Sequence, residues 1–456
     1  MTGKTGTMAR DFTQGPIFGP LFRFSLPFML SNALQVLYNA VDMFIVGRYT
    51  GAVGLASVIN AGRVFVFLTM LSVGLSMSGQ IYVAQLLGQG RRDALNTAVG
   101  TFFTTLLVSG AALSVVGLVW SRAMLRAINV PEEAFDGALA YVRICGAGLV
   151  FSFGYNMVSA VLRGMGDSKR PFVFVAIASL ANVVLDLVAV AWLGWGPAGA
   201  ALATILGQAI SFVFAWTYLM RRRESFGFDF RPASFVPVRA VFSAQMRLAV
   251  PFAVRFAAIN VSMMYVLRLV NGLGIAASTV FGVGVQMDDI VTKITQGIMQ
   301  AATGMVGQNY GASRFDRVRR VVVGAWLFSV GFYIVYGALL VMRTEEMFGI
   351  FTDDAAVLAL APVFVRNIVW QFPGLALMRG TNGFINGIGN ARLALLFGLL
   401  DGVVLRIGCS WLLGSVLGMG LAGYVLGYAI ACYGMGVPSL AYFLWGNWEK
   451  RGAVTK

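Results

Sequence analysis

The stretch FVFVAIASLANVVLDLVAVAWL, from Phe172 to Leu193, decides the fold class. This apolar run is long enough to cross the hydrocarbon core of a bilayer as one helix. Asn182 and Asp186 interrupt it four residues apart, so they project from the same face of that helix. A charged carboxylate in the hydrocarbon layer costs at least ~2.5 kcal/mol on insertion scales. Asp186 therefore needs a partner, a bound cation or a proton, and we interpret this face as part of a coupling-ion site in a membrane transporter.

Similar apolar runs fill the rest of the chain. Of its 456 residues 58% are hydrophobic, and the mean hydropathy is +0.78. Backbone groups must be paired within the bilayer, which favours helices, so we predict an all-α integral membrane protein with twelve transmembrane helices. Their expected ranges are 17–47, 52–86, 95–120, 138–162, 171–193, 198–220, 248–271, 275–307, 321–342, 355–385, 393–414 and 421–446.

The residue types present exclude several kinds of chemistry. The chain has no histidine, which removes Ser-His-Asp and Cys-His catalysis and histidine metal sites. Cys145, Cys409 and Cys432 lie in apolar runs, which indicates free, packed thiols rather than disulfides. Because no nucleophile–base pair or metal cluster occurs, we expect no enzyme, no cofactor and no metal beyond a possible Na⁺.

The distribution of charge predicts topology. A net charge of +15 could suggest nucleic acid, but sixteen basic residues fall in alternate loops that would face the cytoplasm, against four in the opposite loops. This asymmetry follows the positive-inside rule. We therefore predict a multi-pass protein of the plasma (inner) membrane with both termini cytoplasmic, surrounded by lipid, without nucleic acid and as a monomer.

The two halves of the chain repeat. Pro27-Phe28 recurs as Pro251-Phe252 at an offset of 224, and Gln85 recurs as Gln308 at 223. Leu193-Gly194 recurs as Leu413-Gly414 at an offset of 220, which aligns Asp186 with Arg406 and Asn182 with Gly402. We predict two six-helix bundles, residues 1–220 and 248–456, related by a pseudo-twofold axis along the membrane normal.

Residues 221–247 form the expected cytoplasmic linker between the bundles. The segment is basic and contains Pro232 and Pro237. Two interpretations stay open: a membrane-surface helix near 238–247, or a plain solvated loop.

Four of the first six spans carry polar residues at helical spacing. These stripes are Asn32, Gln35, Tyr38, Asn39 and Asp42; Ser152, Asn156 and Ser159; Ser179, Asn182 and Asp186; and Ala200, Thr204, Gln208 and Ser211. Interhelical hydrogen bonds would explain the serines, but they explain two carboxylates poorly. The stripes predict an internal cavity, with Gln35, Tyr38, Asn39, Asn156 and Gln208 as candidate substrate contacts.

The second half differs because its spans are rich in arginine. Asp288-Asp289 near Lys293 could form a second ion site, but an ion pair between Asp289 and Lys293, four residues apart, is the better explanation.

Four stretches together resemble the multidrug and toxic compound extrusion (MATE) transporters over nearly the whole chain. They are YNAVDMFIVGR at 38–48, LRGMGDSKRP at 162–171, NVVLD at 182–186 and GQNYGA at 307–312. The resemblance implies two bundles around a V-shaped cavity that work by alternating access. It also implies that Asp42, Asn182, Asp186 and Thr204, with the Ala200 carbonyl nearby, bind H⁺ or Na⁺. Relatives with a second acidic site in spans 7 and 10 differ, because those spans here contain Arg255, Arg268 and Arg366.

The predicted function is therefore efflux of small organic, cationic or amphipathic compounds in exchange for H⁺ or Na⁺. Ion binding would change the packing of the first span, where Pro27 already removes one backbone hydrogen bond. The alternative is a flippase for lipid-linked oligosaccharides or another anionic lipid, whose diphosphate would suit the arginines of the second half.

Overall fold

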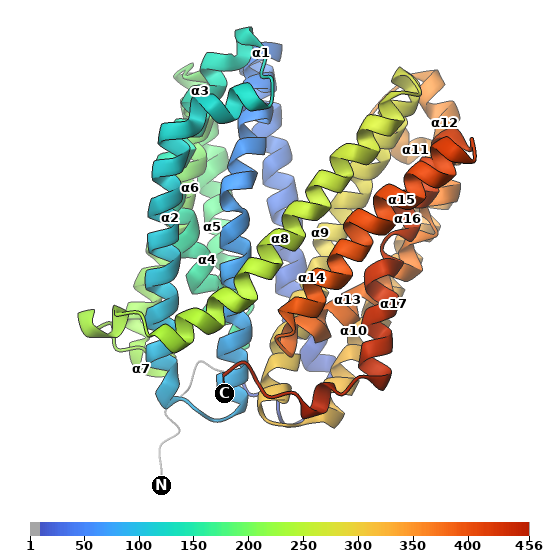
Figure 1. Ribbon diagram of the computed structural model, residues 1–456. Helices are drawn as coiled ribbons and strands as arrows, with labels where there is room; N and C mark the ends of the chain where they lie inside the picture. The colour runs from blue at the N-terminus through green and yellow to red at the C-terminus, as the bar shows by residue number, and fades with distance from the viewer. Residues whose placement is uncertain (1–9, 456) are drawn as a thin grey trace. The chain divides into compact units, whose positions relative to one another are not determined.

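Residues 10–455 are described by a computed structural model, and this range consists of helices and short connections without a strand (Figure 1). Residues 1–9 and residue 456 lie outside the described residues. The outermost part of each predicted bundle, at the two ends of the chain, is therefore not described. The chain divides into two compact units. Unit 1 contains residues 30–250, and unit 2 contains residues 12–29 and 251–454.

The helices of unit 1 follow the first six predicted spans. They are α1 Phe18–Gly88 (from Leu30 onward), α2 Asp93–Ala127, α3 Glu132–Ala147, α4 Leu149–Gly164, α5 Lys169–Asp186, the π-helix η1 Leu187–Trp192, α6 Gly196–Arg221, α7 Arg223–Phe226 and the 3₁₀ helix η2 Pro232–Phe235.

The helices of unit 2 follow the last six. They are α8 Arg239–Asn271 (from Pro251 onward), α9 Ile275–Gly311, α10 Phe315–Met342, α11 Thr344–Gly349, α12 Ala355–Ile368, α13 Gln371–Gly387, α14 Ala391–Leu399, the π-helix η3 Leu400–Leu405, α15 Arg406–Trp411, the π-helix η4 Leu412–Val416, α16 Gly420–Ile430, α17 Tyr433–Trp445 and the 3₁₀ helix η5 Trp448–Lys450.

These helices make twelve spans. Within the described range eight helical stretches are long and apolar enough to cross a membrane, and the bent pairs α3–α4 and α12–α13 add two more. The 71-residue α1 is too long for one crossing at 1.5 Å per residue, and it is broken at Gly51, so it supplies two. The 37-residue α9 supplies the twelfth, although it carries Asp288, Asp289 and Lys293 in its middle. The predicted fold class is confirmed.

Two helices change unit along their length, and both do so beside a proline. α1 passes from unit 2 into unit 1 between Met29 and Leu30, just after Pro27. α8 passes from unit 1 into unit 2 between Val250 and Pro251. The first turns of α1 pack closely within unit 2, where a Cβ added to Gly297 would lie 2.5 Å from the Met29 nitrogen.

The left-handed turns fix the register of the repeat. Residues with positive φ recur at an offset of 223 in three places, and Gly194 and Gly196 recur as Gly418 and Gly420 at an offset of 224. The backbone hydrogen bonds before the last two pairs recur as well: Leu193 N donates to Val188 O, and Leu417 N donates to Leu412 O. The offset of 220 predicted for this stretch is therefore wrong by one helical turn. Asn182 corresponds to Arg406, and Asp186 corresponds to Ser410.

The linker is packed against α2. Thr104 Oγ1 donates to Phe235 O at 2.5 Å, and the Val238 amide donates to Thr101 Oγ1 at 3.1 Å. Gly100 is required here, because a Cβ at that position would collide with the Ser234 carbonyl. Both interpretations of this segment are corrected: it is not a plain solvated loop, and residues 239–247 are the first turns of α8 rather than a separate surface helix.

Candidate functional site

Two buried carboxylates face each other in unit 1. Asp42 lies in α1 and Asp186 is the last residue of α5, and their side chains are within hydrogen-bonding reach of each other. Asp186 is fully buried and Asp42 is 9% exposed. Within the described part of the chain, neither oxygen of Asp186 has a hydrogen-bond donor, and one oxygen of Asp42 also lacks one. A proton or a cation would supply what this pair lacks, because two adjacent carboxylates cannot both stay charged cheaply in a low dielectric.

Polar groups from α5 and α6 surround the pair. Asn182, one turn before Asp186, is buried, and among the described residues both its amide nitrogen and its amide oxygen lack partners. Thr204 is half-buried, and its side chain lies near that of Tyr141 of α3. Ala200 is fully buried one turn before Thr204.

Oxygen ligands are therefore concentrated at one place. Carboxylate, amide and hydroxyl oxygens are the hard donors that suit an alkali cation, and the carboxylate pair alone suits a proton. The geometry fits either ion, and a chain without histidine has no imidazole for a transition metal.

The five candidate substrate contacts are less uniform in position. Gln35 and Asn39 are exposed on α1, and Tyr38 between them is partly buried close to both aspartates. Asn156 of α4 is partly buried and donates through Nδ2 to Ser72 Oγ at 3.1 Å. Gln208 of α6 is partly buried, and its Oε1 accepts no hydrogen bond from any described residue.

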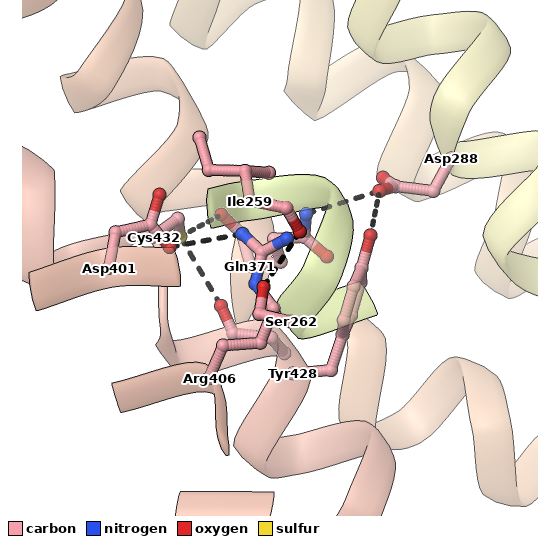
Figure 2. A network of polar contacts seen from close by, with 9 residues as sticks. Ile259, Ser262, Asp288, Gln371, Asp401, Arg406, Tyr428 and Cys432 are labelled. Atoms are coloured by element: carbon pink, nitrogen blue, oxygen red, sulfur yellow. Dashed lines mark hydrogen bonds and ion pairs between the residues drawn. The ribbon is translucent and has the colours of Figure 1, made fainter. Parts of the chain in front are cut away.

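Unit 2 contains a buried polar network that links five helical elements (Figure 2). Arg406 Nη2 is 3.0 Å from Asp401 Oδ1, and the Arg406 guanidinium lies 5.2 Å from the centre of the Tyr428 ring. Asp288 Oδ2 accepts from Gln371 Nε2 at 3.1 Å and from the Tyr428 hydroxyl at 3.4 Å. The expected pair between Asp289 and Lys293 is confirmed at 2.7 Å.

Comparison with known proteins identifies the family. The MatE family model matches residues 27–188 and again 251–412. The chain belongs to the MatE family. Both MatE matches begin at the repeated proline, and their ends differ by 224 residues, in agreement with the register of the left-handed turns. Members of this family are membrane transporters rather than enzymes.

Relatives and solved structures cover nearly the whole MatE chain. It is 26% identical over 455 residues to a probable multidrug resistance protein, YpnP of Bacillus subtilis, covering 98% of this chain and 99% of that one. Two solved structures superpose with a TM-score of 0.90: a MATE protein in its straight conformation, 22% identical over 97% of this chain and 98% of that one, and a MOP superfamily transporter from Pyrococcus furiosus, 21% identical over 99% and 100%. The latter is described as having a binding pocket of reverse polarity that suggests a different function. The bacterial relatives place this MatE protein in the plasma membrane as a multi-pass transporter.

The MatE repeat places different chemistry at the position in unit 2 that corresponds to the aspartate site. With the offset of 224, Asn182 corresponds to Arg406 and Thr204 to Tyr428. Asp42 lies between Pro27, where the offset is 224, and Gly51, where it is 223, so it corresponds to Val266 or Tyr265. Asp186 corresponds to Ser410 and Ala200 to Tyr424, and Ser410 Oγ donates to Tyr424 O at 3.4 Å. The corresponding place in unit 2 thus holds a guanidinium above a phenol ring.

Sequence reasoning missed two parts of these sites. Tyr141 was missed because the polar stripe of its predicted span, Ser152, Asn156 and Ser159, begins three turns after it. The network around Asp288 was also missed, since Gln371, Arg406 and Tyr428 come from spans far apart in the chain. Two tyrosines at helical spacing in an otherwise apolar span, Tyr424 and Tyr428, were a signal that the sequence did offer.

Proposed function

We propose that this protein is an antiporter that exports small organic compounds in exchange for H⁺ or Na⁺, and that Asp42 and Asp186 hold the ion. The observation that carries the proposal is the pair of buried carboxylates within reach of each other, with both Asp186 oxygens lacking a donor in the described range. The naming of relatives such as YpnP as probable multidrug resistance proteins supports export of more than one compound.

Asn182, Thr204 and the Ala200 carbonyl complete the proposed site. Na⁺ would use these oxygens together with the carboxylates, whereas H⁺ would need the carboxylate pair alone. Each charge that crosses the membrane contributes about 2.3 kcal/mol per 100 mV, which is enough to bias two conformations of similar energy. The coupled step would be alternating access of one substrate site to the two sides of the membrane.

The ion and the helix bend are coupled through α1 in this proposal. Asp42 and Pro27 lie on the same helix, and Pro27 cannot donate a backbone hydrogen bond to Arg23 O. Neutralising Asp42 would change the packing of α1, and the bend at Pro27 would carry this change along the helix. Gln35, Tyr38 and Asn39, on the intervening turns, would then change their contact with substrate. Asn156 and Gln208 would complete the substrate contacts from α4 and α6.

The proposed orientation rests on the excess of basic residues in alternate loops, which places both termini in the cytoplasm. The proposed functional unit is a monomer. The comparisons give the lipid flippase alternative no support.

Efflux of a fluorescent organic cation from proteoliposomes, driven by a pH gradient or by a Na⁺ gradient, tests the proposal. Asp42→Asn and Asp186→Asn each keep the side-chain volume but remove the charge, so gradient-driven efflux is expected to fall to the level of empty liposomes. Asp289→Asn, a carboxylate of similar chemistry in a partly exposed pair, is the matched control and should transport normally. Efflux at the wild-type rate in either site variant would overturn the assignment. The gradient that drives the wild type identifies the ion.

A further inference from the structure

The buried charges of unit 2 do not balance. Outside the Asp289–Lys293 ion pair, which is neutral, three arginines and two aspartates lie partly or fully buried within the predicted spans of this unit: Arg255, Arg379, Arg406, Asp288 and Asp401. The fold therefore encloses one positive charge in excess. A buried charge without compensation is costly, whereas a buried charge with a paired group or ligand is tolerated.

Four of these five groups have partners. Asp401 pairs with Arg406, and Asp288 accepts from Gln371 and Tyr428 (Figure 2). Arg379 is 2% exposed, and its guanidinium donates to Thr295 Oγ1 and to the Thr292 carbonyl, both at 3.1 Å. These contacts leave Arg255 as the group that carries the excess charge.

Arg255 is held in place but is not paired. A Cβ at Gly398 would lie 2.3 Å from Arg255 Cδ, so the Arg255 side chain packs directly against residue 398, where only glycine leaves room for it. Its guanidinium lies 5.5 Å from the centre of the Phe252 ring. Arg255 Nη1 is buried and has no acceptor among residues 10–455. Asp401 is near enough to interact electrostatically, but it is already paired with Arg406.

We propose that Arg255 is an anion-recognition site of unit 2, which binds the carboxylate group of an exported compound. The side chain as a whole is partly exposed, while its buried Nη1 is the atom that lacks an acceptor. A guanidinium binds a carboxylate through two parallel hydrogen bonds, so a carboxylate that enters beside Arg255 would supply the missing acceptor. Arg406 serves a different purpose: it is the fixed cation that neutralises Asp401. This proposal rests on the proposed export function and adds to it that preferred substrates carry a carboxylate beside their apolar or cationic part.

Equilibrium binding of two matched dyes to the purified protein in a neutral detergent tests the site. One dye is a rhodamine with a free carboxylate, and the other is the methyl ester of the same rhodamine. A hydrogen bond to a charged group contributes about 1.5–3 kcal/mol, so the wild type should bind the acid about 10- to 100-fold more tightly than the ester. Arg255→Gln should reduce this ratio to about one, and Arg255→Lys should keep part of it.

Controls separate this site from a general effect of charge. Arg366→Gln removes an exposed arginine of α12 and should leave the ratio unchanged. Excess benzoate should displace the acid from the wild type without displacing the ester, which tests the site even if an Arg255 variant does not fold. An equal ratio in the wild type, an unchanged ratio in Arg255→Gln, or displacement of the acid by phosphatidylglycerol would overturn the proposal. Gradient-driven efflux of the ester is a separate measurement, and its loss would count against the antiport function alone.

Discussion

At the scale of single residues, the two halves place opposite chemistry at equivalent positions. Asn182 in α5 has no amide partner among the described residues and lies one turn from Asp186, whereas Arg406 at the corresponding position donates to Asp401. In unit 1 an exchangeable ion can compensate the carboxylates beside Asn182. In unit 2 the guanidinium of Arg406, which is part of the chain, compensates Asp401. The repeat therefore explains why the proposed ion site would occur in one of two similar halves.

The Arg406–Asp401 pair gives a prediction about stability. Their side chains are 11% and 4% exposed, and removing one partner from a buried pair costs about 3–5 kcal/mol because the other charge remains uncompensated. Arg406→Gln and Asp401→Asn should each lower the melting temperature in detergent by several degrees. The double variant should recover most of the loss. A double variant that melts at the sum of the two single losses would show that the pair is not coupled.

At the scale of elements, the spans could be predicted from the sequence but the contacts between them could not. Apolar length places a helix in the membrane regardless of its neighbours, and the twelve predicted ranges match the helices. The sequence alignment of the repeat is wrong by one helical turn. The residue pair Leu-Gly recurs at 413–414, but the left-handed turn that contains Gly194 and Gly196 recurs at Gly418 and Gly420. Nearness of Asp42 to Asp186 depends on how α1 packs against α5, which helical spacing within either span does not determine.

The contacts of the linker could not be predicted from the sequence either. The pH dependence of stability tests one of them, the hydrogen bonding of Asp229. The pKa of Asp229 is lowered because its carboxylate accepts hydrogen bonds from the Ser234 hydroxyl, the Arg231 amide and Asn96. Its stabilising effect is therefore fully present above the ordinary aspartate pKa of about 4 and is lost as the pH falls through the lowered value. The wild type should melt higher than Asp229→Asn at neutral pH, and the difference should shrink below about pH 4. A difference independent of pH would contradict this role.

At the scale of the whole molecule, one helix of each unit has its first turns in the other unit. α1 begins in unit 2 and continues into unit 1, while α8 begins in unit 1 and continues into unit 2. Each change of unit lies within three residues of a proline that corresponds to the other through the repeat, Pro27 and Pro251. A proline inside a helix removes a backbone hydrogen bond and bends the helix. In each helix a point weakened by proline thus lies where the helix passes from one compact unit to the other.

Replacing these prolines should slow transport without destabilising the protein. Pro27→Ala and Pro251→Ala each restore a backbone hydrogen bond, to Arg23 O and Arg247 O, and stiffen the helix at the boundary between units. Gradient-driven efflux should fall several-fold in rate, with binding of the dye and the melting temperature unchanged or slightly higher. Pro438→Ala is the matched control, because that proline also lies inside a helix, α17, but the whole of α17 belongs to unit 2. If the boundary variants transport as fast as the control, bending at these prolines is not part of the cycle, and the motion that accompanies ion exchange must arise elsewhere in α1 and α8.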